Sequence, residues 1–203
     1  MKKNKISKNW INKQRRDIYV RKSKVEGYRS RAAYKIQEID NKFKIFKNGH
    51  SIIDLGAAPG SWSQFIIKNY KNTKIAAVDL KHIEKLDNVF LMKGDFTDTI
   101  FQQKIRSNFN DKTDVIISDM AVNTTGNKNV DSIVTGELCL EAIKFAKEML
   151  KKNGQFISKL FMGSTFNEII KYSKETFKET NIFKPPASRK DSKENFLISK
   201  NLR

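Results

Sequence analysis

Short apolar runs rich in β-branched residues alternate along this chain with longer segments of helical periodicity. We predict strands over 51–55, 74–80, 89–92, 114–118 and 155–161, with two closing strands near 181–183 and 196–199. We predict helices over 31–43, 62–70, 98–107, 132–152 and 165–176, with Ser30 as the first N-cap and Gly154 as the C-cap of the fourth helix. Strands connected through helices run parallel, and helices cover both faces of their sheet. The alternation therefore predicts an α/β fold with a mostly parallel central sheet.

The length of 203 residues suits one domain with an appendage, because domains typically hold about 100 to 200 residues. Neither an internal repeat nor a linker rich in glycine, serine or proline divides the sequence. We therefore expect a basic N-terminal arm over 1–26 and a single domain over 27–203.

The cysteine and histidine content excludes two kinds of stabilising site. One cysteine, Cys139, cannot form an internal disulfide, and with two histidines it cannot complete a structural zinc site. The basic N-terminus is followed by no apolar stretch of a signal peptide, and nowhere do about 18 apolar residues run together. We expect a monomer in the reducing cytoplasm, with no membrane contact and no metal.

The positive charge is concentrated in the first quarter of the chain. The formal net charge is +18, and residues 1–50, with 16 basic and 4 acidic side chains, hold +12 of it. A general excess of lysine would act on the whole chain and does not explain this asymmetry. A concentrated basic segment attracts a phosphate backbone, and here aromatic residues are interleaved with it, without the apolar face of a membrane-binding helix. The expected partner is a nucleic acid.

Polar residues follow four of the predicted strands and would meet at one edge of the sheet. They are Asp54, which begins the segment DLGAAPGSW, and Asp79, Asp95 and Asp119. Gly56 and Gly60 allow a tight turn and a close approach of the backbone to a ligand. Their spacing is not that of a dinucleotide-binding G-x-G-x-x-G loop, and no Walker lysine follows. A ribose, an amino group and a positive centre suit these acids, and S-adenosylmethionine has all three.

The order of these motifs resembles the FtsJ-type RNA ribose 2′-O-methyltransferases. The segments that carry the resemblance are RSRAAYK, DLGAAPGSW, VDL, GDF, SDMAVN, GQFISKLFMG and KPPASRKDSKENFLI. They extend from about Gly27 to Ile198. The resemblance implies a class I, Rossmann-like methyltransferase fold and S-adenosylmethionine as cofactor. The small size and the basic arm are most similar to the bacterial members that methylate a uridine ribose of 23S rRNA in the large ribosomal subunit.

The resemblance also implies which residues act. The cofactor-binding residues would be Gly56, Ala58, Pro59, Gly60, Trp62, Asp79, Asp95 and Asp119. The catalytic tetrad of the family corresponds to Lys35, Asp119, Lys159 and Glu194.

The chemistry of methyl transfer needs these residue types. A ribose 2′-hydroxyl is a poor nucleophile, so its proton must leave during the attack. We expect Lys159 to be the general base, because it lies in an otherwise apolar strand where an unpaired ammonium is costly. Partial burial and the charge of Lys35 would favour its neutral amine. We expect Asp119 to orient Lys159, and Glu194 to hold Lys35 or the substrate hydroxyl.

Three residues depart from the family pattern. Ser61 replaces a glycine, Phe196 replaces a tyrosine, and Val122 replaces a proline beside the expected reaction centre, which leaves the shape of the substrate loop 123–131 open. The alternatives to 23S rRNA are a tRNA or mRNA-cap ribose. A further alternative is a non-catalytic RNA-binding factor of ribosome assembly with the same fold.

Overall fold

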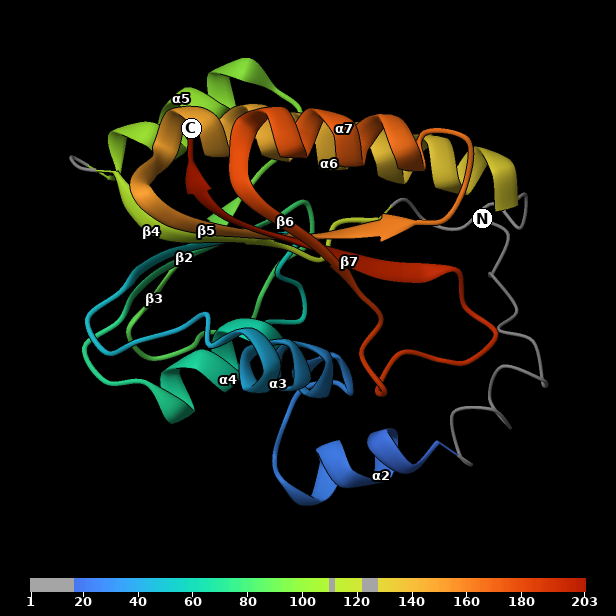
Figure 1. Ribbon diagram of the computed structural model, residues 1–203. Helices are drawn as coiled ribbons and strands as arrows, with labels where there is room; N and C mark the ends of the chain where they lie inside the picture. Colours follow the sequence, from blue (N-terminus) through green and yellow to red (C-terminus); the bar gives the residue numbers. More distant parts are fainter. Residues whose placement is uncertain (1–16, 110–111, 122–127) are drawn as a thin grey trace, which may run out of the picture.

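A computed structural model describes residues 17–109, 112–121 and 128–203 of the protein. One seven-stranded sheet has the strand order β3-β2-β1-β4-β5-β7-β6 (Figure 1). Its strands are β1 (Ser51–Leu55), β2 (Lys74–Asp79), β3 (Val89–Lys93), β4 (Thr113–Ser118), β5 (Leu150–Phe161), β6 (Phe177–Phe183) and β7 (Glu194–Leu202). The helices are α2 (Ile18–Val25), α3 (Ala32–Phe43), α4 (Ser61–Asn69), α5 (Thr99–Ser107), α6 (Lys128–Met149) and α7 (Phe166–Thr176).

The first five strands of the sheet order run parallel, and β7 is antiparallel to its neighbours β5 and β6. The mostly parallel α/β sheet expected from the sequence is therefore confirmed. Strands β6 and β7 are longer than the predicted strands near 181–183 and 196–199. Charged and polar residues at their ends hid these parts from a prediction based on apolar runs, but the strand pairing continues through them. In the residues that the structure describes, no helix is both long and apolar enough to cross a membrane.

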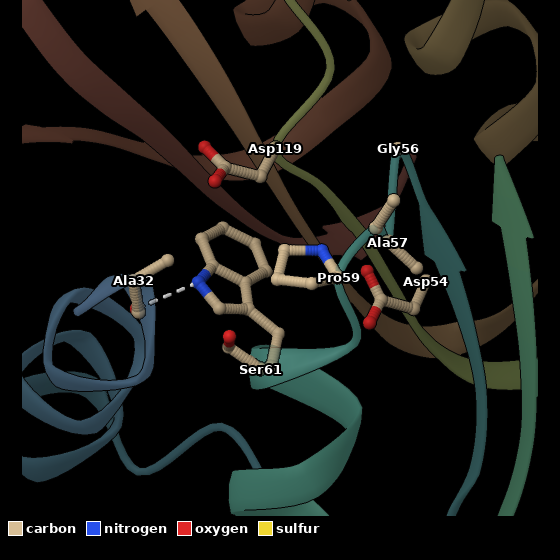
Figure 2. A pocket seen from close by; sticks show the side chains of 9 residues that line it. Ala32, Asp54, Gly56, Ala57, Pro59, Ser61 and Asp119 are labelled. Carbon is tan, nitrogen blue, oxygen red and sulfur yellow. Dashed lines mark hydrogen bonds between the residues drawn. The ribbon is translucent and has the colours of Figure 1, made fainter. Parts of the chain in front are cut away.

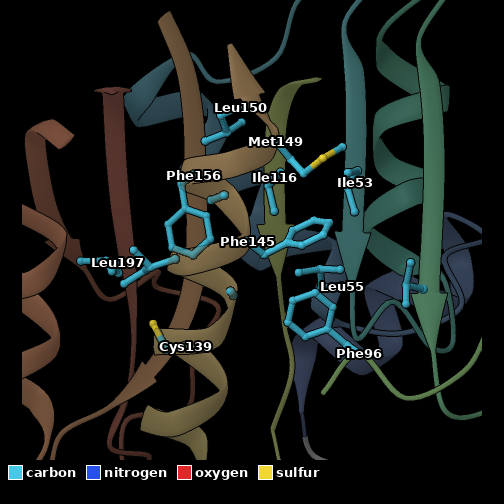
Figure 3. Packing of buried hydrophobic residues seen from close by; sticks show 14 of the residues in the cluster. Ile53, Leu55, Phe96, Ile116, Cys139, Phe145, Met149, Leu150, Phe156 and Leu197 are labelled. Carbon is cyan, nitrogen blue, oxygen red and sulfur yellow. The ribbon is translucent and has the colours of Figure 1, made fainter. Parts of the chain in front are cut away.

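Each face of the sheet carries its own apolar core. Helices α5, α6 and α7 cover one face, and α3 and α4 cover the other, with α2 outside them (Figure 1). Figure 3 shows the first core, where Phe145 and Cys139 of α6 pack against Phe156 of β5 and Ile116 of β4. Full burial of one such side chain contributes about 1.5–3 kcal/mol. Cys139 is 1% exposed and packs as a small core residue.

The expected helix end at Gly154 is wrong. Helix α6 ends at Met149, and Gly154 lies inside β5, at an irregularity where the register with β4 shifts. A Cβ atom on Gly154 would lie 2.8 Å from the carbonyl oxygen of Lys151. The absence of a side chain at Gly154 thus permits a close approach of two backbone segments within the strand. A glycine after a helical segment is equally typical of a helix C-cap, so the sequence alone did not distinguish the two.

The described part of the expected N-terminal arm is helical. Asp17 caps α2 by accepting a hydrogen bond from Tyr19 N at 3.0 Å, and its carboxylate lies 2.6 Å from Arg31 Nη1. The Tyr19 ring packs on Tyr34 of α3, with 5.3 Å between ring centroids. Residues 1–16 lie outside the described residues, so the division into an arm over 1–26 and a domain over 27–203 stays a prediction.

Candidate active site

The candidate site lies where the direction of strand addition reverses in the sheet. The chain leaves β1 toward β2 on one side, while β4 pairs with β1 on the other side. In open α/β sheets a ligand binds beyond the carboxyl ends of the strands at this switch point. A cavity of about 660 Å³ lies here. Its lining includes Gly56 and Ala58 after β1, Asp79 at the end of β2, Asp95 after β3, and Asp119 after β4.

The glycine-rich loop that follows β1 is folded back onto the sheet edge. The N–H groups of Gly56 and Ala57 donate to the carbonyl oxygen of Val78 at 2.8 and 3.0 Å. Gly56 has a φ of +71°, and a Cβ atom there would lie 2.8 Å from the backbone of Met120. Both the positive φ and the close approach require glycine at this position. The loop therefore reaches the cavity with backbone rather than with side chains.

Two strand-end carboxylates are held by backbone N–H groups. Asp79 Oδ2 accepts from Ala58 N at 2.9 Å, and Asp79 Oδ1 accepts from Lys81 N at 2.8 Å. Asp95 accepts from the hydroxyl and the N–H of Thr97, which lowers the pKa of Asp95. These bonds fix the direction of both carboxylates. Each oxygen of Asp79 keeps a lone pair for another donor, whereas both Thr97 bonds go to Asp95 Oδ1 and leave Asp95 Oδ2 for another donor.

A second, smaller hollow is lined by Pro59 and Trp62, which do not line the large cavity, and also by Gly56, Ala58 and Asp119 (Figure 2). Trp62 Nε1 donates to the Ala32 carbonyl at 2.9 Å, so the indole joins α4 to α3. Asp54 is fully buried in this hollow, where it accepts from Ser63 Oγ at 2.7 Å, and its other oxygen has no hydrogen-bond partner among the described residues. Burial raises the pKa of Asp54 to about 7. The sequence marked Asp54 as a strand-end acid without giving it a role.

Lys159 and Asp119 form an ion pair at the edge of the large cavity. Lys159 Nζ lies 2.7 Å from Asp119 Oδ1 and donates to the Asp119 carbonyl oxygen, also at 2.7 Å. Lys159 is only 8% exposed. Burial alone raises the pKa of Asp119, but the ammonium groups of Lys159 and Lys35 outweigh burial, and the pKa lies below its ordinary value. Asp119 therefore stays ionised between two lysines.

Lys35 and Glu194 form a second buried pair, with 2.7 Å between Nζ and Oε2. Burial alone lowers the pKa of Lys35, but the carboxylates of Asp119 and Glu194 outweigh it and raise that pKa above its ordinary value. The other oxygen of Glu194 accepts from Ser188 Oγ at 2.7 Å. Glu194 is thus held from both sides, and Lys35 keeps its charge.

The alternation of strand residues brings the two pairs to one face of the sheet. Lys159 of β5 is the cross-strand partner of Phe196 of β7, and Glu194 precedes Phe196 by two residues, so both β7 side chains share a face. Phe196 packs under α3 and α4, with its ring centroid 5.7 Å from that of Trp62 and 5.8 Å from Lys35 Nζ. The phenylalanine that replaces a tyrosine is fully buried, between the Trp62 indole and the Lys35 ammonium.

Of the other two departures from the family pattern, the structure describes Ser61 but not Val122. The Ser61 hydroxyl lies 2.7 Å from the Ser30 hydroxyl, which also accepts from Ala32 N at 3.2 Å, so the serine connects the start of α4 to the start of α3. Val122 and residues 123–127 of the expected substrate loop lie outside the described residues.

The apolar lining of the large cavity was not predicted from the sequence. It comprises Val78, Leu80, Phe96, Met120, Val134 and Leu138. Three of these residues directly follow a strand-end aspartate, which is a signal that the sequence contained. Val134 and Leu138 come from α6, and only the packing of that helix brings them to the cavity.

Comparison with known proteins places the chain in a family. The FtsJ-like methyltransferase model matches residues 28–202. The chain is 61% identical over 203 residues, covering 100% of both chains, to Ribosomal RNA large subunit methyltransferase E of Pelagibacter ubique (strain HTCC1062). A Plasmodium falciparum protein described as a ribosomal RNA methyltransferase has a crystal structure with a TM-score of 0.77 and 34% identity, covering 86% of this chain and 98% of that chain.

A more distant solved structure shares the fold alone. It is a Streptococcus mutans protein described as a methyltransferase, in complex with S-adenosylhomocysteine, with a TM-score of 0.54 and 14% identity over 85% of this chain and 96% of that chain. The family resemblance inferred from the motifs is confirmed by the match over residues 28–202 and by the full-length relative. The chain belongs to the FtsJ-like methyltransferase family.

Proposed function

We propose that this protein transfers a methyl group from S-adenosylmethionine to a ribose 2′-hydroxyl in the RNA of the large ribosomal subunit, at a uridine of 23S rRNA. The name of the full-length relative supports the RNA, and the family supports the reaction. The observation that carries the mechanism is the buried pair of Lys159 and Asp119 beside the cavity.

The residues present fit S-adenosylmethionine. The cavity of about 660 Å³ lies within the usual range of small-molecule sites, about 300–1,000 Å³. Carboxylates at strand ends suit the hydroxyl and amino groups of the cofactor, and the apolar lining suits its adenine. When bound, the cofactor supplies a methyl group on a positively charged sulfur. We propose that Gly56, Ala58, Asp79, Asp95 and Asp119 hold it, with Pro59, Gly60 and Trp62 shaping the loop.

We propose Lys159 as the general base. An ammonium has no lone pair, so Lys159 accepts the hydroxyl proton only as a neutral amine. Asp119 fixes Nζ through its carboxylate and its carbonyl oxygen, at 2.7 Å in both contacts. This double contact orients the amine toward one position. Such alignment of base and hydroxyl supplies a large part of the rate of a proton transfer.

Lys35 and Glu194 have a different proposed role. Lys35 keeps its positive charge, which stabilises the negative charge that develops on the ribose oxygen as its proton leaves. Glu194 holds that ammonium in place through the contact of 2.7 Å. Because the two pairs differ in role, removing Lys35 should reduce the rate less than removing Lys159.

The test supplies labelled S-adenosylmethionine together with large ribosomal subunits, free rRNA, tRNA or capped mRNA, and then locates the label by nuclease digestion. We expect label on the 2′-oxygen of a uridine of the large-subunit RNA. Label on a base, label only on tRNA or on an mRNA cap, or binding without any transfer would overturn the proposal. The last result would identify a non-catalytic assembly factor.

The basic N-terminal arm is proposed to supply affinity for RNA to a monomer that acts in the cytoplasm. We expect that neutralising Lys13, Arg15 and Arg16, which lie outside the described residues, weakens RNA binding and flattens its dependence on salt. An unchanged slope of log Kd against log salt concentration would contradict this role. Sedimentation of the protein alone tests the monomer.

A further inference from the structure

Arg29 connects the two loops that border the cofactor cavity. Its Nη1 donates to the carbonyl oxygens of Pro59 and Glu84, both at 2.9 Å, and its Nη2 donates to that of Lys85 at 2.8 Å. Pro59 belongs to the glycine-rich loop after β1. Glu84 and Lys85 belong to the loop after β2. All three acceptors are backbone groups, so the contact depends on the course of both loops and not on their side chains.

The two connected loops carry the cavity lining. Gly56 and Ala58 line the cavity from the first loop, and Leu80 and Lys81 line it from the second. A direct bond also joins the loops, since Ala58 N donates to Asp79 Oδ2 at 2.9 Å. A shift of one loop against the other would therefore change the place of Asp79 relative to the glycine-rich backbone.

The base of the Arg29 side chain is itself fixed. Arg29 N donates to Gln64 Oε1 at 2.9 Å, and Gln64 Nε2 donates to the Gly27 carbonyl at 2.7 Å, so the backbone on both sides of Tyr28 is attached to α4. The guanidinium also occupies space that a side chain at position 60 would fill, so Gly60 is required beside it. A Cβ atom there would lie 2.8 Å from Arg29 Nη1.

Arginine is the side chain that this arrangement requires. Its planar guanidinium presents five N–H donors in fixed directions, whereas lysine has one rotating ammonium on a shorter reach. A basic residue near the substrate of an RNA-binding protein would ordinarily be assigned to phosphate contacts. Here, however, at least three of the five donor hydrogens already point to protein carbonyl groups.

We propose that Arg29 is a positioning residue for the cofactor, which holds the loop after β1 against the loop after β2, and that it is not a phosphate contact for RNA. The inference rests on S-adenosylmethionine as the ligand of the cavity, and it is independent of the roles proposed for the two lysines. It assigns the first arginine of the RSRAAYK segment to cofactor affinity rather than to substrate affinity.

Calorimetric titration of S-adenosylmethionine and of S-adenosylhomocysteine, with no RNA present, tests the proposal on Arg29→Ala and Arg29→Lys. We expect the Kd for both ligands to rise about tenfold in Arg29→Ala, since about 1.4 kcal/mol corresponds to tenfold and the lost bonds are partly exposed. Arg29→Lys keeps the charge and should remain several-fold weaker than the wild type. The Kd for RNA should be unchanged in both variants.

Hydrogen exchange measured by mass spectrometry provides a second readout, and the peptide over residues 80–88 should exchange faster in both variants. Lys171→Ala is the control, because it removes one exposed positive charge from α7 on the opposite face of the sheet. It should leave cofactor binding and exchange unchanged.

The results that would contradict the role of Arg29 differ from those that would contradict the proposed function. Wild-type cofactor affinity in Arg29→Lys, or weaker RNA binding with unchanged cofactor binding in Arg29→Ala, would overturn the proposal. If Arg29→Ala does not fold, the comparison of Arg29→Lys with the wild type decides alone. A wild-type protein that binds neither ligand would instead overturn the proposed function.

Discussion

The ammonium of Lys159 lies 2.7 Å from the carboxylate of Asp119 and contacts the backbone carbonyl of the same residue, although 40 positions separate the two in the chain. Asp119 directly follows β4, and Lys159 lies in the neighbouring parallel strand β5. The pair is therefore created by sheet register. It is also largely buried, and the neighbouring lysines keep the pKa of Asp119 below its ordinary value.

Replacing Lys159 should abolish methyl transfer without removing cofactor binding. We expect Lys159→Ala to lower kcat at least about 100-fold, because general bases contribute about 10² to 10⁴. Lys159→Arg should be equally inactive, since a guanidinium stays protonated in proteins. Transfer of labelled methyl to large-subunit RNA measures the rate, and calorimetry measures the cofactor. Wild-type turnover in Lys159→Arg would exclude a proton-accepting role.

Glu194→Gln should reduce both activity and stability, because it leaves the buried ammonium of Lys35 without its nearest anionic partner. Loss of one partner of a buried pair costs about 3 kcal/mol. Glu148→Gln is the matched control, since its pair with Arg106 is much more exposed and should contribute less than about 1 kcal/mol. Urea unfolding of both variants gives the comparison. Equal losses would mean that burial of the Lys35 pair has no energetic consequence.

Ser188→Ala should affect turnover more than cofactor binding. The variant removes the hydrogen bond to Glu194 Oε1, worth about 1 kcal/mol, and frees the carboxylate to rotate away from Lys35. We expect kcat to fall several-fold while the Kd for S-adenosylmethionine stays constant. Ser173→Ala, which removes a buried hydroxyl of α7 that is hydrogen-bonded to Ser199 of β7, should change stability and leave kcat unaltered. A loss of turnover in both variants would point to general loosening of the fold.

Asp54 should make stability depend on pH. Burial raises the pKa of Asp54 from the ordinary 3.8 to about 7 in the folded state. Below pH 4 the carboxyl is neutral in both states, and as the pH rises toward 7 the unfolded chain loses this proton first. Folding is therefore progressively disfavoured. We expect Asp54→Asn, which cannot ionise, to be more stable than the wild type by an amount that grows from pH 4 to 7.

The upper limit of this gain is about 4 kcal/mol, since one pKa unit corresponds to about 1.4 kcal/mol. Urea unfolding of the wild type and of Asp54→Asn at pH 5 and pH 8 measures it. A difference that does not change with pH would show that Asp54 is ionised to the same extent in both states.

Cys139 should be unreactive in the folded protein. Burial raises the pKa of its thiol to about 12, and the side chain is 1% exposed, so neither thiolate nor access is available. A disulfide reagent at pH 8 should release no chromophore from the native protein within minutes. The same reagent should react with one equivalent of thiol after unfolding in guanidinium chloride. Rapid reaction of the native protein would reveal opening between α6 and the sheet.

Local properties of the sequence were enough to predict where the helices and strands lie and which edge of the sheet carries the site. Strand β1 agrees with the predicted 51–55, and α3 begins one residue later than predicted, because apolar periodicity and turn residues act over a few positions. Four strand-end acids were expected to meet at one edge of the sheet; Asp79, Asp95 and Asp119 line the cavity, whereas Asp54 is buried in the smaller hollow. The fold class and the family are confirmed, while the roles of the site residues stay predictions.

Tertiary structure alone decided the contacts that give these residues their chemistry. Lys35 and Glu194 are 159 positions apart, and only the packing of α3 against β7 joins them. Gly154 likewise lies inside β5 because of its neighbours in the fold. The three hydrogen bonds of Arg29 depend on the course of two loops that are distant from it in the sequence. A residue type and its spacing predict an element, because both are local; partners, burial and charge state depend on which distant surfaces the packed sheet and helices bring together.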